Sequence, residues 1–321
     1  MTTALFFLIP IGLLTVVWSV CFVGCHFPTS GEAAPFSDFV LQQEPSLLAY
    51  WPLNDPLGSP PAPPPTGSQG IATATDLSGK GHVGSYLLPP IYPTVAGSAG
   101  PMQMPNGPAV NLQAGSIVPG DAGSTTNSNP NSADFEGGYV SIPWSAPNML
   151  SDFTLEAWIQ PHFTGTMFDW SVFSAFINNT GFRVVITGTQ NGTQLAVVIG
   201  NGTAGVEFAL TRPIDPTDTT YIAATCDMSG NVTLFAEGLQ QDTPATPQMF
   251  PGTGYVPVDA TQQVNYFIGA GQNEVALRTQ NGAMGAPEFP FQGQIQSVAL
   301  YGTALTPTDL KSHFSAGTPE G

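Results

Sequence analysis

The stretch that decides the fold is FQGQIQSVALYGTALTPTDL, residues 291–310. Side chains alternate along its first half, as they do on a β-strand, where neighbouring residues point to opposite faces. One set is Ile295, Ser297, Ala299 and Tyr301, and the other is Gln296, Val298 and Leu300. The alternation predicts a strand over 291–302. This strand has no acidic or basic side chain, in a chain that contains 22 Asp and Glu residues.

A short helix is expected directly after this strand. Thr306 is suited to be the N-cap, Pro307 the first helical residue, and Asp309 the acid that completes an approximate capping box. Gly317 is expected to end the helix, because glycine readily adopts the left-handed conformation that follows helix C-termini.

Upstream of this stretch, short β-branched or aromatic segments alternate with Asn-Gly, Gly-Thr and Pro turn signals. A spacing of roughly 8–12 residues is typical of an antiparallel sandwich or barrel. The expected strands are 47–53, 138–143, 153–161, 171–178, 182–188, 194–200, 206–211, 220–227, 231–238, 265–271 and 291–302. Ahead of them, Ser37 can cap a short helix that Pro45 ends. The sequence therefore predicts an all-β fold with few helices.

Three segments interrupt this regular pattern. Residues 59–70 are rich in proline, which favours an extended loop. Residues 76–86, DLSGKGHVGSY, are punctuated by glycine and predict a turn. Residues 87–132 are rich in Pro, Gly, Ser and Asn and predict an irregular insertion. Such insertions either contact a partner or act as disordered spacers, and both interpretations stay open.

The first 25 residues predict a membrane anchor. Residues 4–24, ALFFLIPIGLLTVVWSVCFVG, carry no charge and are about as long as a helix that crosses a bilayer. The anchor residues are Leu5, Phe6, Phe7, Leu8, Ile9, Leu13, Leu14, Val16, Val17 and Trp18. The alternatives are a cleaved signal peptide and a lipoprotein signal with lipid on Cys25, although the basic n-region of such signals is missing.

These segments give the expected domain boundaries. The anchor occupies 1–25, a linker with a short helix 26–45, the β-domain 46–317 and a tail 318–321. We expect a single-pass membrane protein whose large domain lies on the extracytoplasmic side, either periplasmic or extracellular.

The charge balance excludes one class of partner. Lys and Arg number five against 22 Asp and Glu, which gives a formal net charge of −17. Nucleic-acid binding needs clustered basic side chains that neutralise phosphates, and the five here lie far apart. The three cysteines form neither a disulfide framework nor a zinc motif, so the domain depends on its hydrophobic core. Cys226 is expected to be a buried strand thiol.

Five motifs resemble those of a known family. In chain order they are LLAYWPLND, DLSGKGHVGSY, FEGGYVSIP, DFTLEAWIQP and FQGQIQSVALYGTALTPTDLKSHF. Together they resemble the laminin-G-like, concanavalin A-like jelly-roll superfamily, and in particular its bacterial exported members. The resemblance implies a jelly-roll sandwich of two antiparallel sheets, with the first and last motif strands side by side. The expected fold is therefore all-β, with one N-terminal transmembrane helix and a short C-terminal helix.

The resemblance leaves three classes of function open, because this fold hosts lectins, enzymes and structural domains. A glycosidase on this fold would carry an E-x-D-x-x-E pattern, which the sequence lacks. By resemblance, Glu156 has a structural role. We therefore expect no enzymatic activity, no catalytic residue and no required cofactor.

A calcium-dependent glycan-binding module is the second class. Asp76 matches a family position often found beside calcium, so the resemblance makes it the candidate metal ligand. The closing strand weakens this expectation, because relatives carry two acids where this chain has Gln296 and Ser297. Trp144 and Trp170 could contact sugar rings, although a lone Trp beside a strand usually belongs to the core.

The third class, which the sequence favours, is a non-catalytic accessory or scaffold subunit that docks onto other proteins of a membrane complex. An anchor raises the effective concentration of the β-domain near other membrane proteins. The insertion and the proline-rich stretch offer extended surface to such a partner. The four histidines, His26, His82, His162 and His313, are expected to be surface or packing residues rather than ligands.

Overall fold

The computed structural model describes most of the expected β-domain. The described residues are 36–55, 72–87, 116–118, 133–136, 138–145, 150–161, 169–189, 192–210, 212–215, 219–237, 239–240, 254–259, 261–262, 264–272, 287–289 and 291–317. The expected anchor, the linker before residue 36, the proline-rich stretch and the tail lie outside these residues and stay predictions. Among the residues described, no helix is long and apolar enough to cross a membrane.

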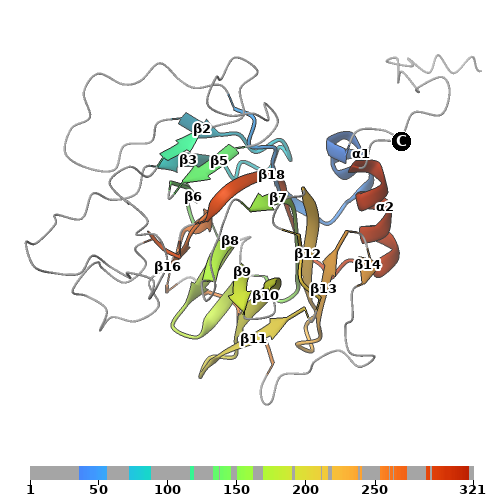
Figure 1. Ribbon diagram of the computed structural model, residues 1–321. Coiled ribbons are helices and arrows are strands. Elements are labelled where there is room, and N and C mark those ends of the chain that lie inside the picture. Colours follow the sequence, from blue (N-terminus) through green and yellow to red (C-terminus); the bar gives the residue numbers. More distant parts are fainter. Residues whose placement is uncertain are drawn as a thin grey trace, which may run out of the picture. The chain divides into compact units, whose positions relative to one another are not determined.

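The first of two large antiparallel sheets, here called the β18 sheet, contains the closing strand (Figure 1). Its order is β14-β13-β12-β7-β18-β5-β4, and β1 also pairs with β18. The strands are β1 (Leu47–Trp51), β4 (Ser116–Val118), β5 (Ala133–Glu136), β7 (Phe153–Pro161), β12 (Thr220–Cys226), β13 (Val232–Ala236), β14 (Leu239–Gln240) and β18 (Gln292–Tyr301). The pairing of β1 with β18 confirms that the first and last motif strands are neighbours.

The second large sheet, here called the β8 sheet, has the order β11-β10-β9-β8-β15-β6-β3-β2. Its strands are β2 (Ala72–Ala74), β3 (Gly84–Leu87), β6 (Tyr139–Ile142), β8 (Asp169–Ile177), β9 (Thr180–Thr189), β10 (Gly192–Gly200), β11 (Gly205–Ala209) and β15 (Tyr266–Ile268). A separate two-stranded ribbon pairs β16 (Gly271–Gln272) with β17 (Pro287–Glu288). The predicted sandwich of two antiparallel sheets is therefore confirmed.

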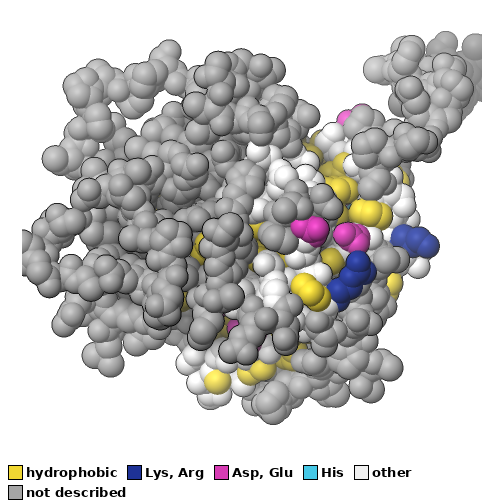
Figure 2. Space-filling view, in the orientation of Figure 1, with side chains coloured by type: hydrophobic (Ala, Val, Ile, Leu, Met, Phe, Trp, Pro, Cys, Tyr) yellow, Lys and Arg dark blue, Asp and Glu magenta, His cyan; other side chains and the backbone are white. Residues whose placement is uncertain are grey.

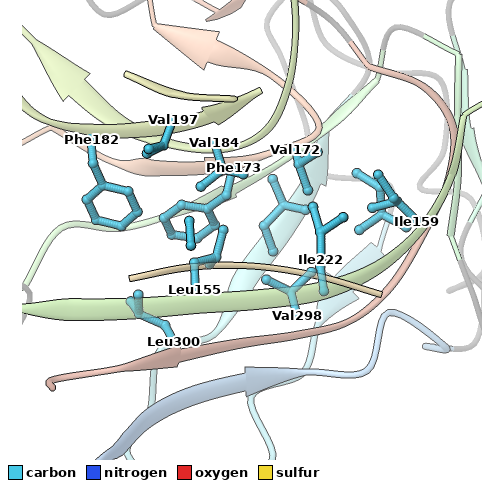
Figure 3. Packing of buried hydrophobic residues seen from close by; sticks show 14 of the residues in the cluster. Leu155, Ile159, Val172, Phe173, Phe182, Val184, Val197, Ile222, Val298 and Leu300 are labelled. Carbon is cyan, nitrogen blue, oxygen red and sulfur yellow. The ribbon is translucent and has the colours of Figure 1, made fainter. Parts of the chain in front are cut away.

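The hydrophobic core fills the space between the two large sheets. Figure 3 shows side chains of both sheets pointing toward one another. Phe173 and Phe182 of the β8 sheet belong to one buried cluster with Leu155 and Ile222 of the β18 sheet. Burying one such side chain completely stabilises the fold by about 1.5–3 kcal/mol. Cys226 is a buried free thiol in the same cluster, as the sequence predicted.

Strand β18 departs from the predicted alternation. A β-bulge interrupts its pairing with β7 between Gln296 and Ala299, and Ser297 has a φ of 54°. A bulge adds one residue to a strand and so moves the following side chains to the other face. Ile295 consequently lies in the core, whereas Ala299 and Tyr301 lie in a second cluster on the outer face. The prediction that these three share one face is wrong, because counting by two cannot anticipate a bulge.

Two short helices cover that outer face and lie side by side in Figure 1. They are α1 (Phe36–Gln43) and α2 (Pro307–Gly317). The predicted capping box of α2 is confirmed: the Asp309 N–H donates to Oγ1 of Thr306 at 3.3 Å, and the Thr306 N–H donates to Oδ2 of Asp309 at 3.0 Å. The end of α2 at Gly317 also agrees with the prediction.

Three further segments differ from the sequence prediction. Residues 84–87, at the end of a predicted turn, form β3. Burial alternates along them, as it does along a strand. Residues 116–118, inside the predicted irregular insertion 87–132, form β4 and pair with β5. The single strand predicted at 265–271 is divided into β15 and β16, since Gly269 has a φ of 79° and interrupts the extended backbone.

The low charge content of the chain is visible on its surface. Only 8% of its residues are charged, about a third of the usual share. Among the described residues on the face shown in Figure 2, few side chains belong to Lys, Arg, Asp or Glu, and the others are hydrophobic or uncharged. Contacts made by this surface therefore depend more on shape and hydrogen bonds than on charge.

The packing of α2 on β7 gives a first testable prediction. A Cβ added to Gly317 would lie 2.2 Å from Cζ2 of Trp158. Gly317→Ala is expected to lower the free energy of unfolding by about 1–3 kcal/mol, which is the usual cost of overpacking. The higher helix propensity of alanine would by itself raise the free energy of unfolding by about 1 kcal/mol. Chemical denaturation measures the difference.

The matched control for this variant is Gly302→Ala. A Cβ added there has side-chain carbons of Leu48 as its nearest neighbours, the closest at 3.3 Å. We expect a change of less than about 1 kcal/mol. If Gly317→Ala proves as stable as the unchanged protein, the close contact with Trp158 does not limit the packing of α2.

Candidate functional site

Asp76, the expected calcium ligand, fastens the loop that contains it to β1. Its Oδ1 accepts the backbone N–H groups of Tyr50 at 3.0 Å and Ser78 at 2.9 Å. Its Oδ2 accepts the N–H of His82 at 2.8 Å, and Nδ1 of the same histidine lies 3.4 Å away. Burial raises the pKa of Asp76, but the hydrogen bonds from His82, Ser78 and Tyr50 outweigh it and hold the pKa well below its usual range.

These donors occupy both oxygens of the Asp76 carboxylate. Ser297 is engaged as well, because its Oγ accepts the hydroxyl of Tyr50 at 3.1 Å. Nowhere in the described part of the chain do three or more His, Cys, Asp or Glu side chains gather as metal ligands. The hydrogen bonds to Asp76 give it a structural role, and calcium binding stays a prediction from the resemblance.

Replacing Asp76 by Asn distinguishes these roles. Asp76→Asn removes a charged acceptor from three backbone N–H groups and is expected to lower the free energy of unfolding by about 2 kcal/mol or more. The melting temperature of the unchanged protein is expected to be the same in calcium and in chelator. Asp259→Asn is the control, since Asp259 accepts the N–H groups of Thr261 and Gln262 in an exposed turn. A calcium-dependent rise in melting temperature that Asp76→Asn abolishes would establish the metal site.

A second carboxylate, Glu156 of β7, is completely buried under the helices. The hydroxyls of Tyr221 and Tyr301 donate to it, and Nδ1 of His313 lies 3.0 Å from its Oε2. Nε2 of His313 lies 3.0 Å from Oε1 of Glu44, which follows α1. The imidazole therefore joins α1, α2 and β7. These contacts agree with the structural role expected for Glu156, and they place His313 in packing rather than on the surface.

Both carboxylates favour the charged form of His313. Burial alone lowers its pKa, but the hydrogen bonds and negative charges of Glu156 and Glu44 outweigh this and raise the pKa from 6.5 to about 8. The protonated imidazole can donate from both ring nitrogens, one to each carboxylate. His313 and Glu156 are fully buried and Glu44 is only partly exposed, so this network holds the helices in place.

The raised pKa of His313 predicts a stability that depends on pH. Because the folded-state pKa exceeds the unfolded one, the stabilisation is complete below pH 6.5 and is lost as the pH rises to about 8. This shift corresponds to about 2 kcal/mol of unfolding free energy. Denaturation curves on both sides of this window measure it. His313→Gln should remove the dependence, and a slope that persists in this variant would assign it to another group.

The outer face of the β8 sheet carries polar side chains, part of which lie under the β16–β17 ribbon. Gln272 of β16 is fully buried, and its Nε2 donates to the backbone oxygens of Ser174 at 3.0 Å and Asn265 at 2.7 Å. Arg183 of β9 is buried as well, with its guanidinium carbon 4.4 Å from the ring centre of Phe289. The ribbon and this aromatic ring therefore close one part of the face.

Another part of this face is polar and accessible. Asp169 of β8 and Gln194 of β10 are half-buried, and Glu207 of β11 is exposed. Strand register places Asp169 and Gln194 beside Thr187, on the side of the sheet opposite the core. Glu207 is exposed as a residue, but neighbouring protein atoms partly desolvate its carboxyl group; this desolvation and the negative charge of Asp169 raise the pKa of Glu207, while Arg183 lowers it. The charges of Asp169, Glu207 and Arg183 therefore lie on the same face of the sheet and influence one another. Asp169, Gln194 and Glu207 are called the outer strip below.

Neither the outer strip nor the ribbon was singled out from the sequence. Trp170 lies in the core, which agrees with the usual place of a lone Trp beside a strand and leaves it no contact with a sugar. Trp144 is partly buried and packs on a small cluster that includes Ile177. The signal that sequence reasoning missed is a group of polar residues that face outward on strands β8 to β11. Asp169 belongs to β8 and Glu207 to β11. Period-two patterns show which residues face outward, but strand register is needed to bring them together.

The comparisons with known proteins agree with this fold. Residues 134–311 match the family model of the Concanavalin A-like lectin/glucanases superfamily. The match spans more than half of the chain, which therefore belongs to this superfamily. No curated protein matched the sequence.

Several solved structures resemble the model. Domain 4 of AbnA, a GH43 extracellular arabinanase from Geobacillus stearothermophilus in complex with arabinotriose, is 15% identical with a TM-score of 0.48, over 84% of this chain and 98% of that domain. Botulinum neurotoxin type C, whose cell entry depends on interaction with two ganglioside molecules, is 13% identical with a TM-score of 0.40, over 57% of this chain and 41% of the neurotoxin chain. Trypanosoma rangeli sialidase is 11% identical with a TM-score of 0.46, over 84% of this chain and 33% of the sialidase chain. This chain thus spans less than half of the neurotoxin and sialidase chains.

Proposed function

We propose that this chain is a non-catalytic glycan-binding module. The ligand contacts the outer strip, Asp169, Gln194 and Glu207, with Arg183 beside it. The observation that carries the proposal is the presence of two carboxylates and an amide on one accessible part of a sheet face, next to the buried guanidinium of Arg183. Sugar hydroxyls donate and accept hydrogen bonds, and these side chains offer both kinds of partner. Membership of a superfamily of lectins and glucanases supports this ligand class.

The spacing of the strands supports binding without cleavage. Glycosidases hold their two carboxyl groups roughly 5–9.5 Å apart, on either side of the sugar bond. Strands β9 and β10 lie between β8 and β11, and Glu207 pairs with Val198, four residues along β10 from Gln194, so Asp169 and Glu207 are neither on paired strands nor at the same level along them. The sequence also lacks the E-x-D-x-x-E pattern of hydrolases on this fold.

The scaffold interpretation rests on other parts of the chain. The anchor at 1–25 and most of the insertion at 87–132 lie outside the described residues. We retain as a proposal that the uncharged stretch 4–24 anchors the protein and that the domain lies on the extracytoplasmic side. In that position a glycan-binding domain would reach surface polysaccharides. Docking onto membrane proteins lacks a supporting contact in the described structure.

Charge-removing variants of the outer strip test the proposed function. Glu207→Gln and Asp169→Asn keep the side-chain shape but weaken the acceptors, so each is expected to reduce affinity about tenfold, or about 1.4 kcal/mol. The ligand is first identified on a glycan array, and affinity is then measured by titration calorimetry. Asp152→Asn is the control, because Asp152 is a half-buried carboxylate just before β7 in the other sheet.

The outcomes separate binding from catalysis. A protein that retains no glycan on the array contradicts the proposed function. Glycan binding that both strip variants leave unchanged contradicts the proposed location. New reducing ends after incubation with the bound oligosaccharide would keep the ligand class but overturn the non-catalytic role.

A further inference from the structure

We propose a second binding site, at the edge of the sandwich, that accepts one uncharged sugar residue. The site, called the edge pocket, is a hollow of about 100 Å³ lined by Leu210, Arg212, Ile214, Asp215, Ala236 and Glu237. Its ligand class rests on the proposed glycan-binding function. Its residues are different from those of the outer strip, so the two sites can be tested separately.

The two walls of the edge pocket come from different sheets. The segment after β11 runs along the start of β10, where the N–H of Leu210 donates to the oxygen of Leu195 at 2.8 Å and the N–H of Ile214 donates to the oxygen of Thr193 at 2.7 Å. On the other side, the N–H of Glu237 donates to the oxygen of Tyr221 in β12 at 2.8 Å. These backbone bonds fix both walls, so the pocket exists before a ligand arrives.

The floor of the edge pocket is apolar and its rim is charged. Leu210, Ile214 and Ala236 are buried. At the rim, Nη2 of Arg212 lies 3.8 Å from Oε2 of Glu237, and both side chains are about half exposed (54% and 47%). An exposed ion pair of this kind contributes little to folding stability. Its donors and acceptors can therefore exchange some contacts for ligand hydroxyls at low cost.

The charges of the edge pocket select the class of sugar. Arg212 supplies one positive charge, and Asp215 and Glu237 supply two negative charges, so the rim is negative overall, as is the chain at −17. An anionic sugar would be repelled. A neutral sugar can bridge the guanidinium and the carboxylates with its hydroxyls and lay its C–H face on the apolar floor.

Glu237 is the first residue of the two-residue connection between β13 and β14, because Ala236 pairs with Leu239. Its φ is 54°, in the left-handed region that glycine and asparagine adopt much more readily than glutamate. The favoured two-residue hairpin turns require a positive φ at this position, so the turn itself accounts for the conformation. Glycine at position 237 would suit the turn better, yet it would remove one wall of the pocket.

This conformation makes Glu237→Gly a sharp test, because folding and binding should change in opposite directions. The melting temperature should stay equal or rise, while the affinity of the edge pocket should fall at least about tenfold. The probes are the neutral trisaccharides maltotriose, cellotriose and xylotriose, with sialyllactose as the anionic comparison. Calorimetry on the full chain should resolve two sites for a neutral probe. Glu237→Gly or Arg212→Gln should weaken only the edge pocket, and Glu207→Gln should weaken only the outer strip.

The possible failures can be told apart. If Glu237→Gly and Arg212→Gln bind as the unchanged protein does, the edge pocket is refuted and the glycan-binding function stands. If the unchanged protein binds none of the probes, the edge pocket is refuted, while the proposed function is decided separately by the glycan array. If sialyllactose binds more tightly than the neutral probes and loses affinity in Arg212→Gln, the pocket is real but the uncharged ligand class is wrong.

Discussion

Strand β18 is the constraint on which the rest of the domain depends, because it is paired on both edges and covered on both faces. β7 occupies one edge, while β1 and β5 share the other. One face packs in the core and the other lies under α1 and α2. A charged side chain in this strand would lose its water, at a cost of several kcal/mol unless paired. Residues 292–301 therefore hold no charge, although the chain has 22 carboxylates.

Local chemistry made much of this architecture predictable from the sequence. The capping box at Thr306 and Asp309 needs no information from the rest of the chain, and β-strand alternation is equally local. The bulge at Ser297 was unpredictable because it exists only relative to the register of β7. The same holds for β4, a strand of three residues that depends on pairing with β5. Sequence patterns thus identify elements, whereas registers and short strands are set by neighbours distant in the chain.

The candidate sites were harder to predict than the fold. A family resemblance could single out Asp76, but the donors that satisfy it include Tyr50, which belongs to a different motif. Similarly, Glu156 and His313 lie at opposite ends of the sequence's regular part and meet only because α2 folds back over β7. The outer strip required the register of β8 to β11. In each case the residue type was visible, but its partner was decided by the tertiary structure.

The coverage of the sheets determines where a ligand can bind. The helices and the network of Glu156 and His313 occupy the outer face of the β18 sheet, and the β16–β17 ribbon closes part of the β8 sheet. Among the described residues, polar groups remain accessible beside the ribbon and at the sandwich edge. Of the arginines there, Arg183 is buried against an aromatic ring and Arg212 is at a rim beside Glu237. With so few cations, a ligand bound at either of these proposed sites would be held mainly by hydrogen bonds to its uncharged groups, which hydroxyl-rich ligands have in the greatest number.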